Sequence, residues 1–155
     1  MNNPVPAVGS TAPDFSLPST SGQEISLASF RGKQHVLIAF FPLAFTSTCT
    51  KEMCAFTDDF DQFAAANVAI LPVSVDATAS LKEYKQKYAM RTELLSDFRR
   101  VVAERYGVLL PDKFYANRAY FLVDKGGTVR WAHVEANASN RREDREIFAE
   151  IAKLG

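Results

Sequence analysis

At 155 residues, with 47% hydrophobic and 23% charged side chains, the chain has the size and composition of a soluble globular protein, and we expect residues 1–155 to form a single domain. The 18 basic and 18 acidic residues cancel, which argues against nucleic acid or an anionic membrane as a partner. No apolar run approaches the roughly 18 residues of a membrane-spanning helix, and the N-terminus lacks a signal-peptide pattern, so we expect a cytoplasmic protein.

The first third of the chain predicts an arm, a hairpin and a buried strand. Residues 1–13 are rich in proline, glycine and serine and predict an irregular arm. Phe15–Leu17 and Glu24–Leu27 flank a Ser-Gly turn and predict a short hairpin. His35–Phe41 is continuously apolar, which indicates a strand with both faces buried. Pro42 ends it, because proline cannot continue a central ladder.

The rest of the chain alternates helices with strands. A long helix is predicted from about Thr48 to Ala66, where apolar residues recur every three or four positions. The later predicted elements are a strand at Val68–Val75, a helix from Ser80 to about Ala89 with a capping box to Glu83, a short helix at Arg99–Tyr106, strands at Arg118–Val123 and Thr128–Val134, and a closing helix capped by Asn140 with Ile147, Ile151 and Leu154 facing inward.

This order of elements predicts an α/β architecture with helices on both faces of one sheet. It is the order of a thioredoxin-like fold, with a central mixed β-sheet flanked by helices and an N-terminal β-hairpin extension. A fold of this kind hosts many functions, so the function has to come from the side chains of a site.

The only two cysteines, Cys49 and Cys54, lie five positions apart just after the buried strand. In a chain without a signal peptide, such a pair is more typical of catalysis or metal binding than of a structural disulfide. Cys49 falls in the first turn of the predicted helix, where unpaired N–H groups and the helix dipole stabilise a thiolate. Its position is that of a nucleophile.

The spacing of the pair constrains what Cys54 does. On an intact helix, Cα atoms five residues apart are about 8–9 Å apart, beyond the roughly 4.4–6.8 Å of a disulfide. A bond between the cysteines therefore requires the start of the helix to unwind. Cys54 as a plain core residue is a second interpretation. A metal site finds little support, because the histidines, His35 and His133, lie far from both cysteines in sequence.

Pro42, Thr46 and Cys49 form the pattern P-x-x-x-T-x-x-C, which is the active-site signature of the peroxiredoxins, and the chain resembles that family. The T-K-E-x-C that follows resembles the peroxiredoxin Q (bacterioferritin-comigratory) branch. The string F-P-L-A-F-T resembles the AhpE branch, which generally lacks the second cysteine. Further matches cover almost the whole chain: G-x-x-A-P-D-F at Gly9–Phe15, V-S-V-D at Val73–Asp76 and R-x-x-F-L-V-D at Arg118–Asp124.

The resemblance implies a role for each matching residue. Cys49 is the peroxidatic cysteine, Cys54 the resolving cysteine, Thr46 a hydroxyl that bonds thiolate and peroxide, Pro42 a shield against water, Arg118 the cation that holds thiolate and peroxide oxygens, and Glu52 the acid that positions the arginine. Other interpretations stay open for three of these: Thr46 as a helix cap, Arg118 as a surface arginine and Glu52 as an ordinary acid at a helix start. Phe45 and Phe41 are expected to line the substrate pocket, although either Phe40 or Phe41 should belong to the core.

The implied activity is that of a thiol-dependent peroxidase acting on hydrogen peroxide and organic hydroperoxides. Cys49 and Cys54 would close an intramolecular disulfide, and thioredoxin or a glutaredoxin-like dithiol would reduce it. The resemblance implies no cofactor and no metal, and a monomer or homodimer. A one-cysteine peroxiredoxin with a structural Cys54 and a non-enzymatic peroxide sensor are the alternatives.

Overall fold

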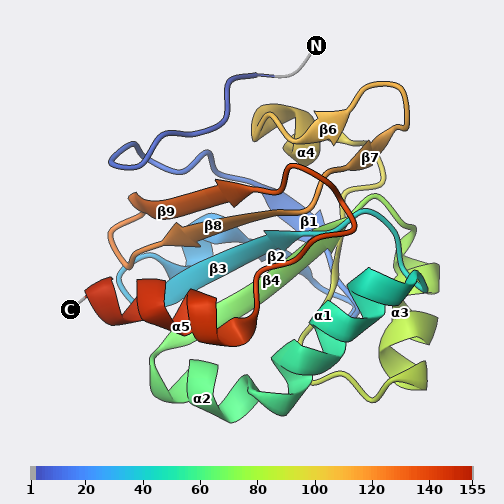
Figure 1. Cartoon of the computed structure of the whole chain (residues 1–155), viewed down its shortest axis with the longest axis horizontal. Helices are drawn as coiled ribbons and strands as arrows, with labels where there is room; N and C mark the ends of the chain where they lie inside the picture. Colours follow the sequence, from blue (N-terminus) through green and yellow to red (C-terminus); the bar gives the residue numbers. More distant parts are fainter. Residues whose placement is uncertain (1–2, 155) are drawn as a thin grey trace.

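The computed structural model describes residues 3–154, so the first two residues of the predicted arm lie outside it. A five-stranded sheet with the order β5-β4-β3-β8-β9 forms its centre (Figure 1). The first three strands in that order run parallel, and β8 and β9 are antiparallel to their neighbours, so the predicted mixed sheet is confirmed. The strands are β3 (His35–Phe40), β4 (Val68–Ser74), β5 (Leu95–Ser96), β8 (Ala119–Val123) and β9 (Val129–Val134).

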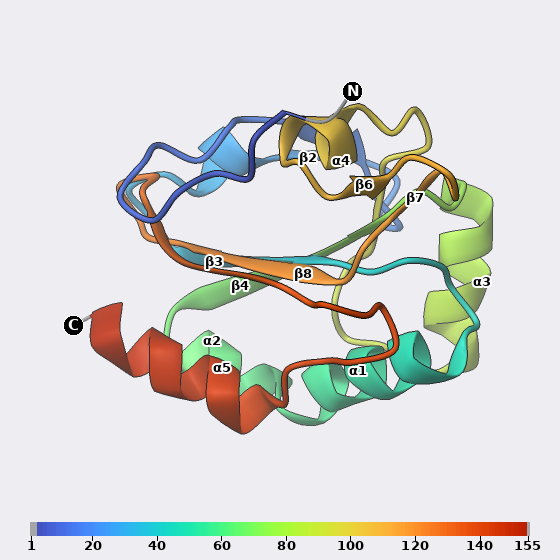
Figure 2. The ribbon, with the colours of Figure 1, turned by 45° about the horizontal axis from the view of Figure 1, so that its top comes forward.

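Both faces of the sheet are covered, as Figure 2 shows. One face carries the helices α1 (Ser47–Asp58), α2 (Phe60–Ala65) and α5 (Asp144–Ile151), the last continued by the 3-10 turn η2 (Ala152–Leu154). The other face carries the hairpin β1 (Ser16–Pro18)–β2 (Glu24–Ser26), the 3-10 turn η1 (Leu27–Phe30), α4 (Val101–Arg105) and the hairpin β6 (Leu109–Leu110)–β7 (Tyr115–Ala116). Helix α3 (Thr78–Lys87) stands at one end of the sheet, and within residues 3–154 every helix is too short or too polar to cross a bilayer.

The central strand β3 supplies both cores in alternation, which explains its continuous apolar run. Val36, Ile38 and Phe40 belong to the core beneath the N-terminal hairpin. Leu37 and Ala39 belong to the core beneath the helices α1, α2 and α5, together with Cys49. The nucleophile candidate is therefore anchored in the helical layer.

The single helix predicted from Thr48 to Ala66 is wrong. The helix stops at Asp58, and Asp59 takes a non-helical backbone conformation, with φ −100° and ψ 12°, before α2 begins. Asp58 and Asp59 place two acidic side chains at a helix C-terminus, where the negative end of the dipole disfavours them. An acid at the start of α2 is favoured for the same reason.

Three other predicted boundaries are also wrong. Helix α3 begins at Thr78, without a side-chain cap and without the box between Ser80 and Glu83. Helix α5 begins at Asp144, capped by a reciprocal Glu143–Glu146 box rather than by Asn140. Helix α4 spans only Val101–Arg105, because Arg100 before it has the left-handed φ of 64°. Within the closing helix, the predicted burial of Ile147 and Ile151 is confirmed, and Leu154 is partly buried against the same core.

Candidate active site

Cys49 lies in the first turn of α1, at the end of the loop that leaves β3. Thr46 is the N-cap of the helix and Ser47 its first residue, so Cys49 is the third helical residue. Only 1% of its surface is exposed. The loop before it is anchored to β4 through Asp76, whose carboxylate accepts a hydrogen bond of 2.9 Å from the Ala44 N–H. The fold thus buries one thiol where backbone N–H groups lack helical partners.

Arg118 directly precedes β8 and points its guanidinium at the thiol. Its Nη2 lies 2.9 Å from Cys49 Sγ, its Nη1 donates to Glu52 Oε1 at 2.8 Å, and its Nε donates to the Ala138 carbonyl at 3.1 Å. The side chain is 1% exposed, so the interpretation as a surface arginine is wrong. A planar fork with three fixed partners gives the charge beside the sulfur a defined direction.

Glu52 sits one turn after Cys49 on α1 and is fully buried. One oxygen accepts from Arg118, and the other accepts a short hydrogen bond from the Tyr120 hydroxyl. Burial raises the pKa of Glu52, while the charge of Arg118 and the hydrogen bond from Tyr120 act against that rise. Burial alone would lower the pKa of Arg118, but Glu52 and Cys49 outweigh it and raise that pKa. The arginine is therefore a permanent cation at the thiol.

The loop residues Pro42 and Thr46, which precede Cys49, differ in burial. Pro42 is buried between β3 and the start of the loop. Thr46 is exposed, and its hydroxyl donates to the Leu43 carbonyl at 2.8 Å. Although Thr46 is the N-cap residue, its side chain makes no capping hydrogen bond. Thr46 is therefore a solvent-exposed hydroxyl residue directly before the helix that carries Cys49.

The two phenylalanines expected in a substrate pocket lie in different places. Phe45 is 49% exposed, has the left-handed φ of 67°, and its ring centre is 4.8 Å from that of Tyr84. Phe41 is fully buried in the same core as Cys49, so it lies on the face of the sheet that carries the thiol, and its place in a substrate pocket stays a prediction. Strand alternation explains the outcome, because it directs Phe41 into the helical core and Phe40 into the opposite one.

No group of three or more histidine, cysteine, aspartate or glutamate residues is placed to hold a metal ion within residues 3–154.

A family model described as the AhpC/TSA family matches residues 8–132. The chain belongs to the AhpC/TSA family of peroxiredoxins. The resemblance found in the motifs is confirmed, and membership makes this peroxiredoxin a thiol-dependent peroxidase.

Relatives from both branches resemble this peroxiredoxin. Alkyl hydroperoxide reductase E of Mycobacterium tuberculosis (strain ATCC 25618 / H37Rv) is 37% identical over 130 residues, or 83% of this chain and 85% of that protein. Peroxiredoxin Bcp of Escherichia coli (strain K12) is 33% identical over 147 residues, or 91% and 93%. The crystal structure of reduced 2-Cys peroxiredoxin from Plasmodium vivax has a TM-score of 0.88 at 32% identity and covers 95% of this chain and 81% of that one. The thioredoxin-like fold is confirmed.

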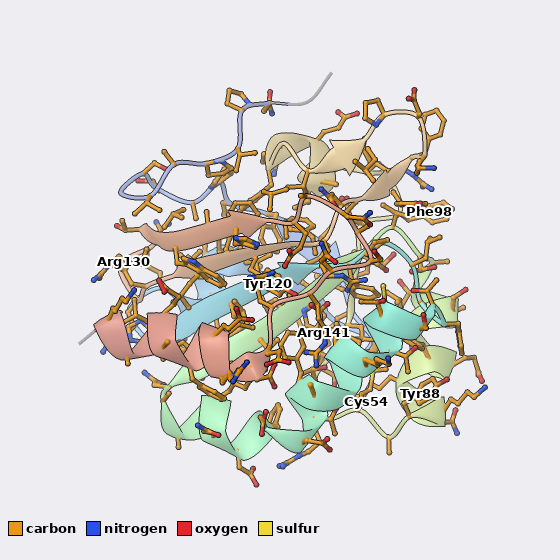
Figure 3. All side chains as sticks on the ribbon, viewed as in Figure 1. Cys54, Tyr88, Phe98, Tyr120, Arg130 and Arg141 are labelled. Carbon is orange, nitrogen blue, oxygen red and sulfur yellow. The ribbon has the colours of Figure 1, made fainter. Side chains whose placement is uncertain are left out.

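The second cysteine of this peroxiredoxin, Cys54, lies on α1 (Figure 3) and is half-buried. Both cysteines are free thiols, and the helix between them is continuous. On an intact helix their Cα atoms are about 8–9 Å apart, too far for a disulfide. Burial, and then the charge of Asp58, raise the pKa of Cys54. In the wound helix, Cys54 is thus a protonated thiol.

Tyr120 is the site residue that the sequence analysis missed. It lies two positions after Arg118 on β8, so the two side chains emerge on the same face of the sheet. That spacing inside R-x-x-F-L-V-D was a signal for it, since a tyrosine in a buried strand needs a partner for its hydroxyl. The segment 135–143 contributes backbone groups to the site: the Ala138 carbonyl accepts from Arg118, and the Arg142 N–H donates to Tyr120. Backbone groups of this kind leave no signal in a sequence.

Proposed function

We propose that Cys49 is the peroxidatic cysteine of this peroxidase and that Cys54 resolves it. The observation that carries the proposal is the buried contact of 2.9 Å between Cys49 Sγ and Arg118 Nη2, with Arg118 held in place by Glu52. A fixed cation stabilises both a thiolate and the negative charge that develops when an O–O bond breaks.

In the first step the Cys49 thiolate attacks one peroxide oxygen. The S–O bond forms, the O–O bond breaks, and the leaving oxygen takes up a proton as water or an alcohol. Arg118 commits three of its five N–H groups to Cys49, Glu52 and Ala138, which leaves two for the peroxide oxygens. The exposed hydroxyl of Thr46 holds the peroxide from the loop side, and buried Pro42 keeps water away from the sulfur.

In the second step the Cys54 thiolate attacks the sulfenic sulfur of Cys49. The S–S bond forms and the S–O bond breaks, with the oxygen leaving as water. The first turns of α1 unwind for this step, because the wound helix holds the cysteines too far apart. A thioredoxin-like dithiol then reduces the disulfide, which fits a working place in the cytoplasm. The enzyme needs no cofactor and works as a monomer or a homodimer.

The half-exposed ring of Phe45 supports organic hydroperoxides as additional substrates. It sits in the loop before Cys49 and its ring packs against that of Tyr84, so it offers an apolar surface close to the start of α1. Second-order rate constants for hydrogen peroxide and cumene hydroperoxide test this, with Phe45→Ala expected to slow only the organic substrate. Reaction with hydrogen peroxide but none with cumene hydroperoxide would limit the enzyme to the smaller substrate.

A one-cysteine cycle is the second candidate, favoured by the burial and the raised pKa of Cys54. Turnover of Cys54→Ser with thioredoxin and thioredoxin reductase separates the two. The two-cysteine proposal expects a fast single reaction with peroxide and then loss of turnover. Full turnover of the variant would make Cys54 structural, and fast oxidation of the native protein without any turnover would indicate a peroxide sensor.

A further inference from the structure

We infer that Tyr120 is a positioning residue that acts through Glu52, holding Arg118 on the Cys49 sulfur and keeping α1 wound until the sulfenate has formed. The inference rests on the proposed function and adds a residue that the matching motifs leave unspecified. Figure 3 shows Tyr120 on the central sheet, on the side that faces α1 and α5.

A single chain of buried contacts joins Tyr120 to the reacting sulfur. The Tyr120 hydroxyl donates to Glu52 Oε2, Arg118 Nη1 donates to Glu52 Oε1 at 2.8 Å, and Arg118 Nη2 reaches Cys49 Sγ at 2.9 Å. Tyr120, Glu52, Arg118 and Cys49 are each at most 1% exposed. Water therefore does not take the place of a partner that is removed, and each lost contact leaves a buried group unsatisfied.

The direction of the tyrosine proton is fixed by its surroundings. The Arg142 N–H donates to Tyr120 Oη at 3.0 Å, so the hydroxyl accepts on one side and its one proton is left for Glu52. The ring is stacked on Trp131, with ring centres 5.9 Å apart and planes inclined by 25°. Burial, and then the charge of Glu52, raise the pKa of Tyr120 far above its ordinary value, so it remains a donor.

The same contact bears on the unwinding of α1. Glu52 lies between Cys49 and Cys54 in the sequence, so the unwinding that joins the cysteines has to withdraw Glu52 from Tyr120 and Arg118. Both contacts therefore favour the wound helix, in which peroxide reacts. Without the tyrosine hydroxyl, we expect a slower reaction with peroxide and easier opening of the helix.

The pH profile gives a readout that a purely structural role would not move. The charged or titratable groups around Glu52 are Cys49 on α1, Arg118 and Tyr120 at β8, Arg141 before α5, and Asp144 on α5. The tyrosine hydrogen bond lowers the pKa of Glu52, so its removal lets Glu52 take up a proton at higher pH. The fall in rate on the acid side should therefore begin at a higher pH in Tyr120→Phe.

The test compares Tyr120→Phe with Tyr106→Phe. Tyr106 is equally buried, in the opposite core, where its hydroxyl donates to the Pro13 carbonyl, so its variant is a matched loss of one buried hydroxyl. In a Cys54→Ser background, oxidation of Cys49 by hydrogen peroxide is followed by rapid quenching and mass spectrometry from pH 4 to 9. Hydrogen–deuterium exchange of residues 47–58 reports opening of α1 in the reduced proteins.

For Tyr120→Phe we expect about a tenfold loss in the peroxide rate constant, an acid limb at higher pH, and about tenfold faster exchange in α1. Tyr106→Phe should leave the rate, the pH profile and the exchange of α1 unchanged. In a Glu52→Gln background, the effect of Tyr120→Phe on the rate should fall below about twofold, because the partner through which it acts is altered.

Equal rates and equal α1 exchange in the two tyrosine variants would overturn the inference, as would a full Tyr120→Phe effect in the Glu52→Gln background. Either result leaves the proposed function intact, provided that the Cys54→Ser parent reacts with peroxide at Cys49. A parent that fails to react contradicts the proposed function itself.

Discussion

Arg118 illustrates why a positive charge alone is not sufficient at this site. Its guanidinium contacts Cys49, Glu52 and the Ala138 carbonyl at the same time, and those partners lie on two different segments of the chain. An ammonium group has the charge but lacks the planar fork that reaches all three.

Substitution of Arg118 by lysine should therefore slow the peroxide reaction strongly. With one directed donor lost at the developing charge, the second-order rate constant should fall about 10²-fold or more. Stopped-flow oxidation by hydrogen peroxide measures it, and Arg130→Lys at a partly exposed ion pair with Asp124 is the control. A fall of less than about threefold in the rate constant of Arg118→Lys would contradict a role for the guanidinium in stabilising the developing charge.

Thr46 provides the second prediction for a single residue. Thr46→Val keeps the shape of the side chain but removes the hydroxyl, so the peroxide rate constant should fall about tenfold or more. Thr46→Ser keeps the hydroxyl and should react nearly as the native enzyme does. If valine and serine behave alike in the same stopped-flow assay, the hydroxyl has no part in holding peroxide.

The sequence predicted these residues where a motif fixed their chemistry. Cys49, Arg118 and Glu52 come together in the structure because the helix start and the strand start meet over one core. The sequence left open which of Phe40 and Phe41 lies on the side of Cys49, because a continuous apolar strand does not reveal which face each side chain takes. Tyr120 was missed because its spacing from Arg118 indicates only a shared face of the sheet, whereas its contact with Glu52 on another element is created by the fold.

Helix α1 is the element on which the chemistry depends. It carries Cys49, the proposed attacking thiol, Glu52, which binds Arg118, and Cys54, the proposed resolving thiol. The helix also ends early at Asp58, and the break at Asp59 separates it from α2.

Oxidation should accordingly change the exchange of α1 amides. After one equivalent of hydrogen peroxide, we expect residues 47–58 of the native protein to exchange faster, while α5 remains protected. Cys54→Ser should keep α1 protected after the same treatment, because its sulfenate has no internal partner. Protection of α1 in the oxidised native protein would show that no disulfide within this helix had formed.

Strands and helix interiors were predicted better than helix ends. Apolar runs reported β3, β4 and β8, and helical periodicity reported the inner face of α5, since burial directly selects those residues. The position of a helix end depends on which of several polar residues caps it. At α5 the cap is the reciprocal pair of hydrogen bonds between Glu143 and Glu146, and not Asn140. The strands β5, β6 and β7 have two residues each, too few to show a period.

Over the whole molecule, one buried carboxyl group ties stability to pH. Asp144 at the start of α5 is 6% exposed, and its carboxyl group lies against that of Asp59. Burial, and then the neighbouring Asp59, raise the pKa of Asp144 from 3.8 to about 8. Between these two pKa values, Asp144 is protonated in the folded protein and ionised in the unfolded chain.

The free energy of unfolding should therefore fall as the pH rises through the window between these two values, and should level off above it. Asp144→Asn removes the titrating group, so at pH 8 it should be more stable than the native protein by about 2 kcal/mol. That difference should vanish near pH 4. Urea unfolding at several pH values measures it, with exposed Asp112→Asn as the control. A difference that does not depend on pH would contradict the assignment.

The overall topology followed from the sequence because the order of elements admits few arrangements. Parallel strands joined through helices and a final antiparallel hairpin lead to one mixed sheet with both faces covered. The contact between half-buried Asp59 and buried Asp144 was beyond the sequence, since the two residues lie at the starts of helices that only the fold brings together.

The central claim is that Cys49 reacts with peroxide and Cys54 resolves it. The most direct test is the mass of the reduced protein after one equivalent of hydrogen peroxide, without reductant, followed by peptide mapping. We predict the loss of two hydrogens, mapped to a Cys49–Cys54 bond. Added oxygen on Cys49 with Cys54 still free would contradict the resolving role, and an unchanged mass would contradict the peroxidatic role of Cys49.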